Sequence, residues 1–384
     1  MFFGHSASKW VEIRKEIPWA RIDWPWSESY SFTQAIRQPM APNATLRVEN
    51  PQGDIRVTGS DTNEIALTAN KRVRAPSKED AERLQAGLEV KLVTAEGGQH
   101  LVTVPNHPQL RVDLGISVPR STAVRLEARR GSAEASDLAG DVSADIDRGD
   151  FAASNIDGSV RVQLRRGSFS ARNVKGSVEL DGRGSDIQVA DVRGQLLIRG
   201  EYSGASDYSN IAGGVKFGSS RTDLEIQKLP GRMEMTLGTL AIREPGGSVS
   251  VSTRNKDIRV EDFAEKVVIV NRGASVELRT SKLPLRDIEV ENHSGPVEVA
   301  IPAKAEFQVE ATARRGSVDS EFPSLEMGRK TETGWIKGQV GQAGATLKLS
   351  TSYGAIRLKR IGPVGEQACL LYTSPSPRDR TRTR

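Results

Sequence analysis

The sequence predicts an all-β protein, a β-solenoid with rungs of about 18 residues, two short strands in each rung and one short capping helix. Three observations carry this prediction. A glycine recurs every 18 residues, at Gly140, Gly158, Gly176 and Gly194. Between these glycines apolar and polar residues alternate, as they do on a strand with one buried face. Apolar residues make up 37% of the 384 residues and glycines number 36, which favours short strands and many turns over a helical bundle.

Each repeat supplies two strands that share one core. The first strand carries Ala133, Phe151, Phe169 and Ile187 in successive copies, and the second carries Val142, Val160, Val178, Leu196, Val215 and Met233. A single rung cannot bury its apolar side chains, whereas stacked rungs share a continuous core. Weaker copies continue through residues 210–211, 228–229 and 262–263. A flattened sandwich of short strands is the alternative architecture.

The turn between the two strands follows the pattern Asx, apolar residue, any residue, glycine. Its first two members are Asp137-Leu138, Asn155-Ile156, Asn173-Val174 and Asp191-Val192 in successive copies. Asx side chains hydrogen-bond to the local backbone, and glycine tolerates a positive φ. We therefore expect the repeated glycines to take the left-handed positions and to align along one edge.

Two segments outside the clear repeats look like a first and a last rung. They are residues 52–57, Gln-Gly-Asp-Ile-Arg-Val, and residues 353–358, Tyr-Gly-Ala-Ile-Arg-Leu. Ser77 begins a short helix that Asp80 can help to cap and Gly87 can end. The apolar side of this helix carries Ala81, Leu84 and Leu88. We expect the helix to cap the stack or to cover an open strand edge.

The chain divides into three parts, residues 1–43, 44–360 and 361–384. The first part is rich in tryptophan, with Trp10, Trp19, Trp24 and Trp26 among basic residues. Tryptophan and basic residues favour the membrane interface, so one interpretation is a juxtamembrane segment after a missing N-terminal membrane helix. The other is a segment that packs over the end of the β-domain. The middle part is the predicted solenoid domain.

The third part is expected to be a disordered tail. Residues 369–379 can be encoded by a nucleotide string that resembles a sequencing-library adapter, so we expect residues 369–384 to be an artefact. A natural tail rich in Ser, Pro and Arg is the alternative. These residues hold the single cysteine, Cys369, and four arginines against one aspartate. Without them the formal charge of +5 falls to +2, which gives no indication of nucleic-acid binding.

No motif predicts a catalytic, cofactor or metal site. The sequence contains no phosphate-binding glycine loop, dinucleotide fingerprint, zinc-protease helix or serine-hydrolase elbow. The four histidines share no metal-ligand spacing. Asp145, Asp147 and Asp150 are close in sequence but lack the remaining ligands of a calcium loop, so a solvated turn explains them better. We expect a noncatalytic protein without a cofactor.

A column of arginines is the candidate binding site. Arg130, Arg148 and Arg166 recur at one turn, with Arg129 and Arg165 beside two of them. In a parallel stack the rungs lie about 4.8 Å apart, so these guanidinium groups could bind phosphates or carboxylates of a polymer. The simpler explanation is a solvated edge whose charge discourages aggregation. Residues 148–150 also spell the integrin-binding tripeptide Arg-Gly-Asp, but the repeat accounts for it, because Arg-Gly-Ser stands there in the neighbouring rungs.

Taken together, the motifs resemble a known family. The opening Gly-Asp-Ile-Arg-Val of residues 53–57, the helix that begins Ser77-Lys-Glu-Asp80, the rungs, and residues 351–358 are similar to the bacterial putative-adhesin domain. The resemblance covers roughly residues 44–360. That family has β-helical repeats and no assigned function. The resemblance implies an exported or membrane-anchored protein of the bacterial cell envelope with a binding role, and it supplies no binding residue.

These observations favour a noncatalytic binding or scaffold protein of the cell envelope, either extracytoplasmic or associated with the membrane. The expected partner is an envelope polysaccharide or another surface protein, and not a nucleic acid. Two alternatives stay open. One is a polysaccharide-acting enzyme, because right-handed β-helices host lyases and hydrolases, although Asp145 and Asp147 form no evident catalytic pair. The other is a sensor whose solenoid signals through a preceding membrane segment.

Overall fold

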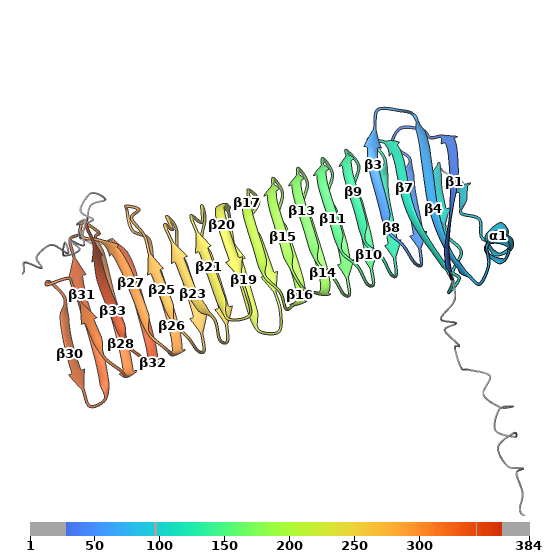
Figure 1. The fold of residues 1–384 in the computed structure, drawn as a ribbon. Helices are drawn as coiled ribbons and strands as arrows, with labels where there is room; N and C mark the ends of the chain where they lie inside the picture. The colour runs from blue at the N-terminus through green and yellow to red at the C-terminus, as the bar shows by residue number, and fades with distance from the viewer. Residues whose placement is uncertain (1–27, 96–97, 343, 363–384) are drawn as a thin grey trace, which may run out of the picture.

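The computed structural model of the protein describes residues 28–95, 98–342 and 344–362. In this part of the chain, 33 strands and one helix of nine residues form an elongated stack of rungs (Figure 1). A typical rung contributes one strand to each of two sheets, whose inner faces enclose one continuous apolar core. The prediction of an all-β solenoid is confirmed.

The two sheets are named A and B, and their strands are given in the order in which they pair. Within the described residues sheet A contains β1 (Glu28–Pro39), β4 (Glu64–Ala75), β7 (Leu110–Pro119), β3 (Ile55–Ser60), β9 (Ala133–Leu138), β11 (Phe151–Ile156), β13 (Phe169–Val174), β15 (Ile187–Val192), β17 (Ser206–Ile211), β20 (Leu229–Met235), β21 (Thr239–Arg243), β23 (Asp257–Glu261), β25 (Val276–Arg279), β27 (Val297–Pro302), β33 (Ile356–Ile361) and β29 (Val318–Ser320). Sheet B contains β5 (Lys91–Thr94), β6 (Gln99–Thr103), β2 (Thr45–Asn50), β8 (Ala123–Ala128), β10 (Val142–Ile146), β12 (Val160–Leu164), β14 (Val178–Gly184), β16 (Leu196–Tyr202), β18 (Val215–Gly218), β19 (Thr222–Ile226), β22 (Val249–Thr253), β24 (Val267–Asn271), β26 (Ile288–Ser294), β32 (Ala345–Tyr353), β28 (Phe307–Arg315), β31 (Thr333–Val340) and β30 (Glu326–Lys330).

The clear repeats stack in parallel with a constant offset of 18 residues. In sheet A, Phe151 lies beside Phe169, which in turn lies beside Ile187. In sheet B, Val160 lies beside Val178. These side chains point inward and are buried, and the rings of Phe151 and Phe169 stack with centroids 6.1 Å apart. Stacking therefore turns each apolar position of the repeat into a column of the core.

The left-handed positions of the turns belong to the Asx residues and not to the repeated glycines. Asp137, Asn155, Asn173 and Asp191 have φ between 55° and 58°. Asn and Asp adopt this conformation more readily than other residues because their short side chains can hydrogen-bond nearby. Here Nδ2 of Asn155 donates to Oδ1 of Asp137 (3.0 Å), and Nδ2 of Asn173 donates to Oδ1 of Asn155 (2.8 Å). The prediction that the glycine column supplies the positive φ is wrong.

The glycine column is needed because neighbouring rungs approach closely. The backbone N–H of Gly176 donates to the carbonyl oxygen of Gly158, and that of Gly194 donates to the carbonyl oxygen of Gly176, both at 3.2 Å. A Cβ atom at Gly176 would lie 2.4 Å from the carbonyl oxygen of Gly158. Any side chain in this column would push the rungs apart, so the repeated glycine reflects a packing requirement.

One rung of the stack runs in the opposite direction. β18 turns back into β19 within sheet B, and β20 turns back into β21 within sheet A, so β19 and β20 are antiparallel to their neighbours. Met233 consequently lies in sheet A, beside Tyr208 and Ile242. Its assignment to the second-strand column is wrong. Alternation of apolar residues along a strand is the same in both directions, so the repeat pattern could not reveal the reversal.

The first and last rungs in chain order lie inside the stack. β2 pairs with β6 and β8, and β3 pairs with β7 and β9. Near the other end, β32 lies between β26 and β28, and β33 lies between β27 and β29. Residues 52–57 and 353–358 are therefore parts of rungs, as expected, but neither segment forms an end of the stack.

The helix α1 (Lys78–Ala86) lies at the N-terminal end of the stack, beside β4 (Figure 1). The hydroxyl of Ser77 accepts a hydrogen bond from the backbone N–H of Asp80, which caps the first turn as predicted. Three apolar residues meet the core: Ala81, which is fully buried, and Leu84 and Leu88, which pack against it. The helix thus caps the core, whereas the edge of sheet A is the strand β1.

β1 falls within the tryptophan-rich segment 1–43 and pairs with β4 over its whole length. This part of the segment therefore belongs to the sheet. The four tryptophans and the predicted artefact at residues 369–384 lie outside the described residues. No helix among the described residues is both long and apolar enough to cross a membrane.

We predict that Gly176→Ala destabilises the fold whereas Gly87→Ala does not. The new methyl group at position 176 would collide with the Gly158 backbone, and overpacking of this kind costs about 1–3 kcal/mol. At Gly87 the nearest atom to a new Cβ is 3.8 Å away and φ is −91°, so the free energy of unfolding should stay within about 0.5 kcal/mol. Urea unfolding followed by circular dichroism measures both. Equal midpoints for the two variants would show that the rungs can separate at the glycine column.

Candidate binding site along the arginine edge

The turns that lead from sheet B to sheet A lie along one edge of the stack because the rungs run in parallel (Figure 1). Nine exposed arginines lie in or next to the turns of this edge between residues 129 and 272: Arg129, Arg130, Arg148, Arg165, Arg166, Arg183, Arg221, Arg254 and Arg272. We call this row the arginine edge.

The three arginines predicted as a ladder occupy consecutive turns of this edge. The backbone N–H of Gly131, next to Arg130, donates to the carbonyl oxygen of Arg148 (2.9 Å). In the same way the N–H of Gly149 donates to the carbonyl oxygen of Arg166 (3.0 Å). Gly131 and Gly149 both have φ of +146°, a conformation that L side chains rarely adopt. The glycine after each arginine therefore shapes the turn and aligns the arginines rung by rung.

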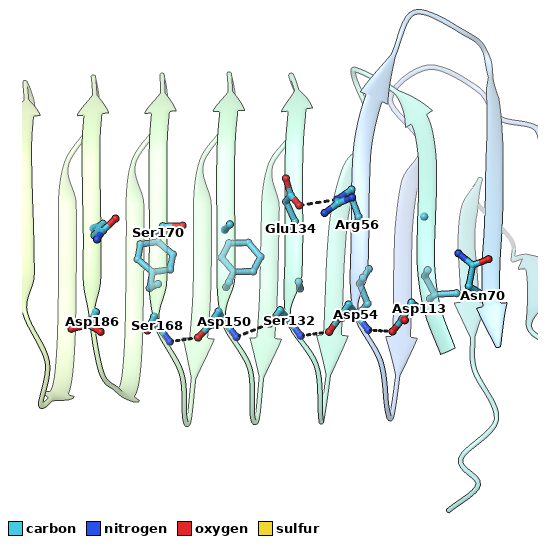
Figure 2. A pocket seen from close by; sticks show the side chains of 18 residues that line it. Asp54, Arg56, Asn70, Asp113, Ser132, Glu134, Asp150, Ser168, Ser170 and Asp186 are labelled. Atoms are coloured by element: carbon cyan, nitrogen blue, oxygen red, sulfur yellow. Dashed lines mark hydrogen bonds and ion pairs between the residues drawn. The ribbon is translucent and has the colours of Figure 1, made fainter. Parts of the chain in front are cut away.

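A ladder of short polar side chains lies where the strands of sheet A begin (Figure 2). The backbone N–H of Asp54 donates to Oδ1 of Asp113 (3.0 Å), and that of Ser132 donates to Oδ1 of Asp54 (2.9 Å). The N–H of Asp150 donates to Oγ of Ser132 (3.2 Å), and that of Ser168 donates to Oδ1 of Asp150 (2.8 Å). The carboxylates of this ladder thus hold neighbouring rungs together through the backbone.

Next to this polar ladder the outer face of sheet A is hollowed into a groove of about 680 Å³ (Figure 2). The short side chains of Ala152 and Ser170 help to line it. An ion pair between Arg56 and Glu134, with Nε and Oε2 2.8 Å apart, also borders the groove. The arginine edge is therefore flanked on one side by a surface with little side-chain bulk.

Arginines on the outer faces of the sheets differ from those on the edge in their partners. Several face arginines pair with carboxylates of the adjacent rung, as in Arg161–Glu179 (2.8 Å), Arg199–Asp181 (2.7 Å), Arg232–Asp207 (2.9 Å) and Arg259–Glu277 (2.9 Å). Hydrogen bonds to these carboxylates raise the pKa of Arg161, Arg199 and Arg232. On the arginine edge, Arg165 lies 3.7 Å from Asp147, and the other eight form no ion pair within the described residues.

The charge of the edge follows from this arrangement. The four turns at residues 129–132, 147–150, 165–168 and 183–186 hold six arginines against Asp147, Asp150 and Asp186. Asp150 and Asp186 each accept a backbone N–H of the next rung. On the opposite edge of the same rungs, Lys175 is paired with Asp157 at 2.7 Å. The arginine edge is thus a row of cationic groups whose guanidinium donors face water.

The whole architecture agrees with one protein family, because a family model described as Toastrack DUF4097 matches residues 43–359. The chain belongs to the Toastrack DUF4097 family. The resemblance to the putative-adhesin domain family is thereby confirmed. Among curated proteins, none matches this Toastrack chain.

Several solved structures are also similar to this Toastrack chain at low identity. A putative cell adhesion protein from Clostridium sporogenes is 11% identical, with 86% of this chain and 100% of that chain covered and a TM-score of 0.21. A putative adhesin from Bacteroides fragilis is 9% identical over 86% of this chain and 97% of its own, with a TM-score of 0.21. A putative lipid binding protein from Parabacteroides distasonis is 11% identical, with the same coverage of 86% and 97% and a TM-score of 0.18.

The three clustered aspartates of the Toastrack repeat are separated by the fold. Asp145 lies on β10 beside Gln163, Asp147 lies at the turn near Arg165, and Asp150 belongs to the polar ladder. No group of three His, Cys, Asp or Glu side chains in the part of the chain that the structure describes is placed to hold a metal ion. In the Arg-Gly-Asp tripeptide, the aspartate carboxylate is bonded to a backbone N–H, which supports its explanation by the repeat.

Sequence reasoning missed four members of the arginine edge: Arg183, Arg221, Arg254 and Arg272. The 18-residue interval could have revealed three of them. Arg183 follows Arg165 by 18 residues, and Arg272 follows Arg254 by the same interval. Arg221 lies in the hairpin of the reversed rung, which has no counterpart in the repeat. Only the folded chain places it on the same edge.

We predict that Asp150→Ala lowers stability and that Asp150→Ser does not. Serine occupies this column at Ser132 and Ser168, so its hydroxyl can still accept the Ser168 N–H, whereas alanine cannot. The loss of one such hydrogen bond costs about 0.5–1.5 kcal/mol. Thermal and urea unfolding of both variants measure the difference. If both variants unfolded like the parent, the carboxylate would have no structural role and would be available for recognition.

Proposed function

We propose that this Toastrack chain is a noncatalytic binding protein of the bacterial cell envelope, and that its arginine edge binds an acidic polymer. The observation that carries the proposal is a contrast between two sets of arginines: face arginines such as Arg161, Arg199 and Arg259 are paired with carboxylates, whereas eight of the nine edge arginines are exposed and form no ion pair in the described residues. The envelope location rests on what the putative-adhesin resemblance implies, and an envelope polysaccharide is the partner that fits both.

A polymer fits the edge better than a small anion does. Parallel rungs repeat at about 4.8 Å, so the arginine turns form a regular row along the long axis of the molecule. Each guanidinium group can donate two parallel hydrogen bonds to a carboxylate or phosphate, and a row of such groups can engage successive charges of one chain. Binding of this kind depends on many weak contacts, so it should weaken as salt screens the charges.

The chemistry of the edge supports binding over catalysis. Guanidinium groups stay protonated at all physiological pH values, so they do not exchange protons with a substrate as a general acid or base must. Beside the row, the carboxylates of Asp54, Asp150 and Asp186 accept backbone hydrogen bonds that hold the rungs in register. The residues of the edge therefore position and attract an anionic ligand.

The test compares two triple variants that remove the same charge. Arg130→Ser, Arg148→Ser and Arg166→Ser together remove three edge arginines, and Arg161→Ser, Arg199→Ser and Arg232→Ser together remove three paired face arginines. Affinity for polygalacturonate is measured by isothermal titration calorimetry at low salt. Three exposed contacts at about 0.5 kcal/mol each predict roughly a tenfold weaker Kd for the edge variant. The face variant should bind like the parent.

Circular dichroism verifies that both variants remain folded. Equal weakening in the two variants would mean that net charge alone drives the interaction, and this outcome contradicts the proposed site. The absence of binding by the parent at low salt would leave the edge as a solvated surface that discourages aggregation.

A further inference from the structure

The reversed rung leaves an opening in the arginine edge. The turn at residues 203–205 joins sheet B to sheet A, and so does the turn at 254–256. Between them, the turn at 219–221 joins two strands of sheet B, and the turn at 236–238 joins two strands of sheet A. On this edge, no turn of the described chain joins the two sheets at these two levels. A cavity of about 370 Å³ lies there, lined by residues of all four turns.

A change in the core columns makes room for this cavity. The column that holds Phe151, Phe169 and Ile187 continues with Ser206, which pairs with Ile187. A hydroxymethyl group thus replaces large apolar side chains at the point where the edge opens. Ser206 is only 3% exposed and lines the cavity. Ser206 therefore places a polar side chain in an otherwise apolar column at the point where the edge opens.

Further buried polar groups line the same cavity. Thr222 and Thr253 are 3% and 5% exposed, and their Oγ1 atoms lie 3.0 Å apart. The hydroxyl of Tyr202 is buried and has no hydrogen-bond partner within the described residues. Burial raises the pKa of Tyr202, so this hydroxyl stays protonated and can donate a hydrogen bond. Phe217 adds an aromatic ring to the wall.

Lys256 places a positive charge inside the cavity. The side chain is 8% exposed, and its Nζ donates to the carbonyl oxygens of Thr236 and Leu237. It forms no ion pair with any residue that the structure describes. An ammonium group has three donors, so one N–H remains for a ligand. Burial lowers the pKa of Lys256, and a bound anion would oppose this shift.

The remaining charges around the cavity are mostly positive. Arg221 and Arg254 are exposed and line the cavity. The one carboxylate in the lining, Glu201, accepts the backbone N–H of Ser220 at 2.7 Å, and hydrogen bonds with Ser220 lower its pKa. Glu201 is therefore engaged with the Ser219–Arg221 turn, and three cationic side chains are left to attract a ligand.

We propose that this cavity binds a sugar that carries one anionic group, a carboxylate or a phosphate. The cationic groups of Lys256, Arg221 and Arg254 hold the anion. The hydroxyls of Ser206, Thr222 and Thr253 hydrogen-bond to those of the sugar, and the ring of Phe217 packs against its apolar face. The volume lies at the low end of the range for small-molecule pockets, which suits a single sugar unit. This site does not depend on polymer binding by the arginine edge.

The experiment uses three probes that differ in charge: glucuronate, glucose 6-phosphate and glucose. Binding to the full chain is followed by isothermal titration calorimetry and by ligand-observed NMR. We expect one or both anionic sugars to bind at one site and neutral glucose to bind at least about tenfold more weakly. Preference for glucuronate or for glucose 6-phosphate identifies the anionic group as a carboxylate or a phosphate. Glucose binding as tight as that of the anions, or binding of none of the probes, overturns the proposal.

Two variants and one control locate the site. Ser206→Ile restores the apolar residue of the adjacent rung, so it should fill the cavity and abolish binding without lowering the melting temperature. Lys256→Met keeps the length of the side chain and removes its charge, so it should weaken anion binding about tenfold or more. The control is the triple serine variant at Arg130, Arg148 and Arg166, which should bind the anionic sugar like the parent. Unchanged binding by a folded Ser206→Ile variant would refute the site.

Discussion

In the clear repeats, backbone hydrogen bonds between parallel rungs place each residue beside the residue 18 positions away, and this register governs most other features of these rungs. For apolar residues it produces columns such as Phe151 and Phe169, whose rings stack. For Asn and Asp it produces amide ladders that support a left-handed backbone. For arginine the same register has the opposite effect, because like charges are brought together.

The faces and the edge of the stack differ in how they accommodate these closely spaced positive charges. On the faces, an arginine of one rung meets a carboxylate of the next, as in Arg161 and Glu179, so stacking stabilises both groups. On the edge, consecutive turns carry arginine after arginine, and the nearby carboxylates of Asp150 and Asp186 are bonded to backbone N–H groups. An external anion would relieve the repulsion that the register imposes on this row. The same physical constraint that builds the fold therefore creates its most distinctive surface.

The ends and the middle of the stack depart from simple repetition, and each departure has a physical consequence. The rungs formed by β2–β3 and β32–β33 lie between two others, so the first and last rungs of the chain are hydrogen-bonded on both sides. In the middle, the reversal at β19 and β20 interrupts the connections between the sheets on the arginine edge. The core there becomes accessible from the edge, where Ser206 takes the place of an apolar residue and Lys256 lines the opening. The arginine edge thus offers a row of charges and, at one point, a cavity that opens to the surface.

The sequence by itself determined the rung, its two strands, its apolar columns and the helix cap, because these features depend on residues close in the chain and on a period that stacking preserves. It also placed Arg130, Arg148 and Arg166 at one turn. Tertiary structure alone decided which residue of the turn is left-handed, because Asn155 and Gly158 are both suited to that role and only the approach of the next rung requires glycine at position 158. It alone decided the direction of β20 and the position of the first and last rungs, because alternation along a strand carries no direction. The opening at Ser206 and the position of Arg221 on the arginine edge depend on which strands pair around the reversed rung. Local sequence patterns do not contain this information.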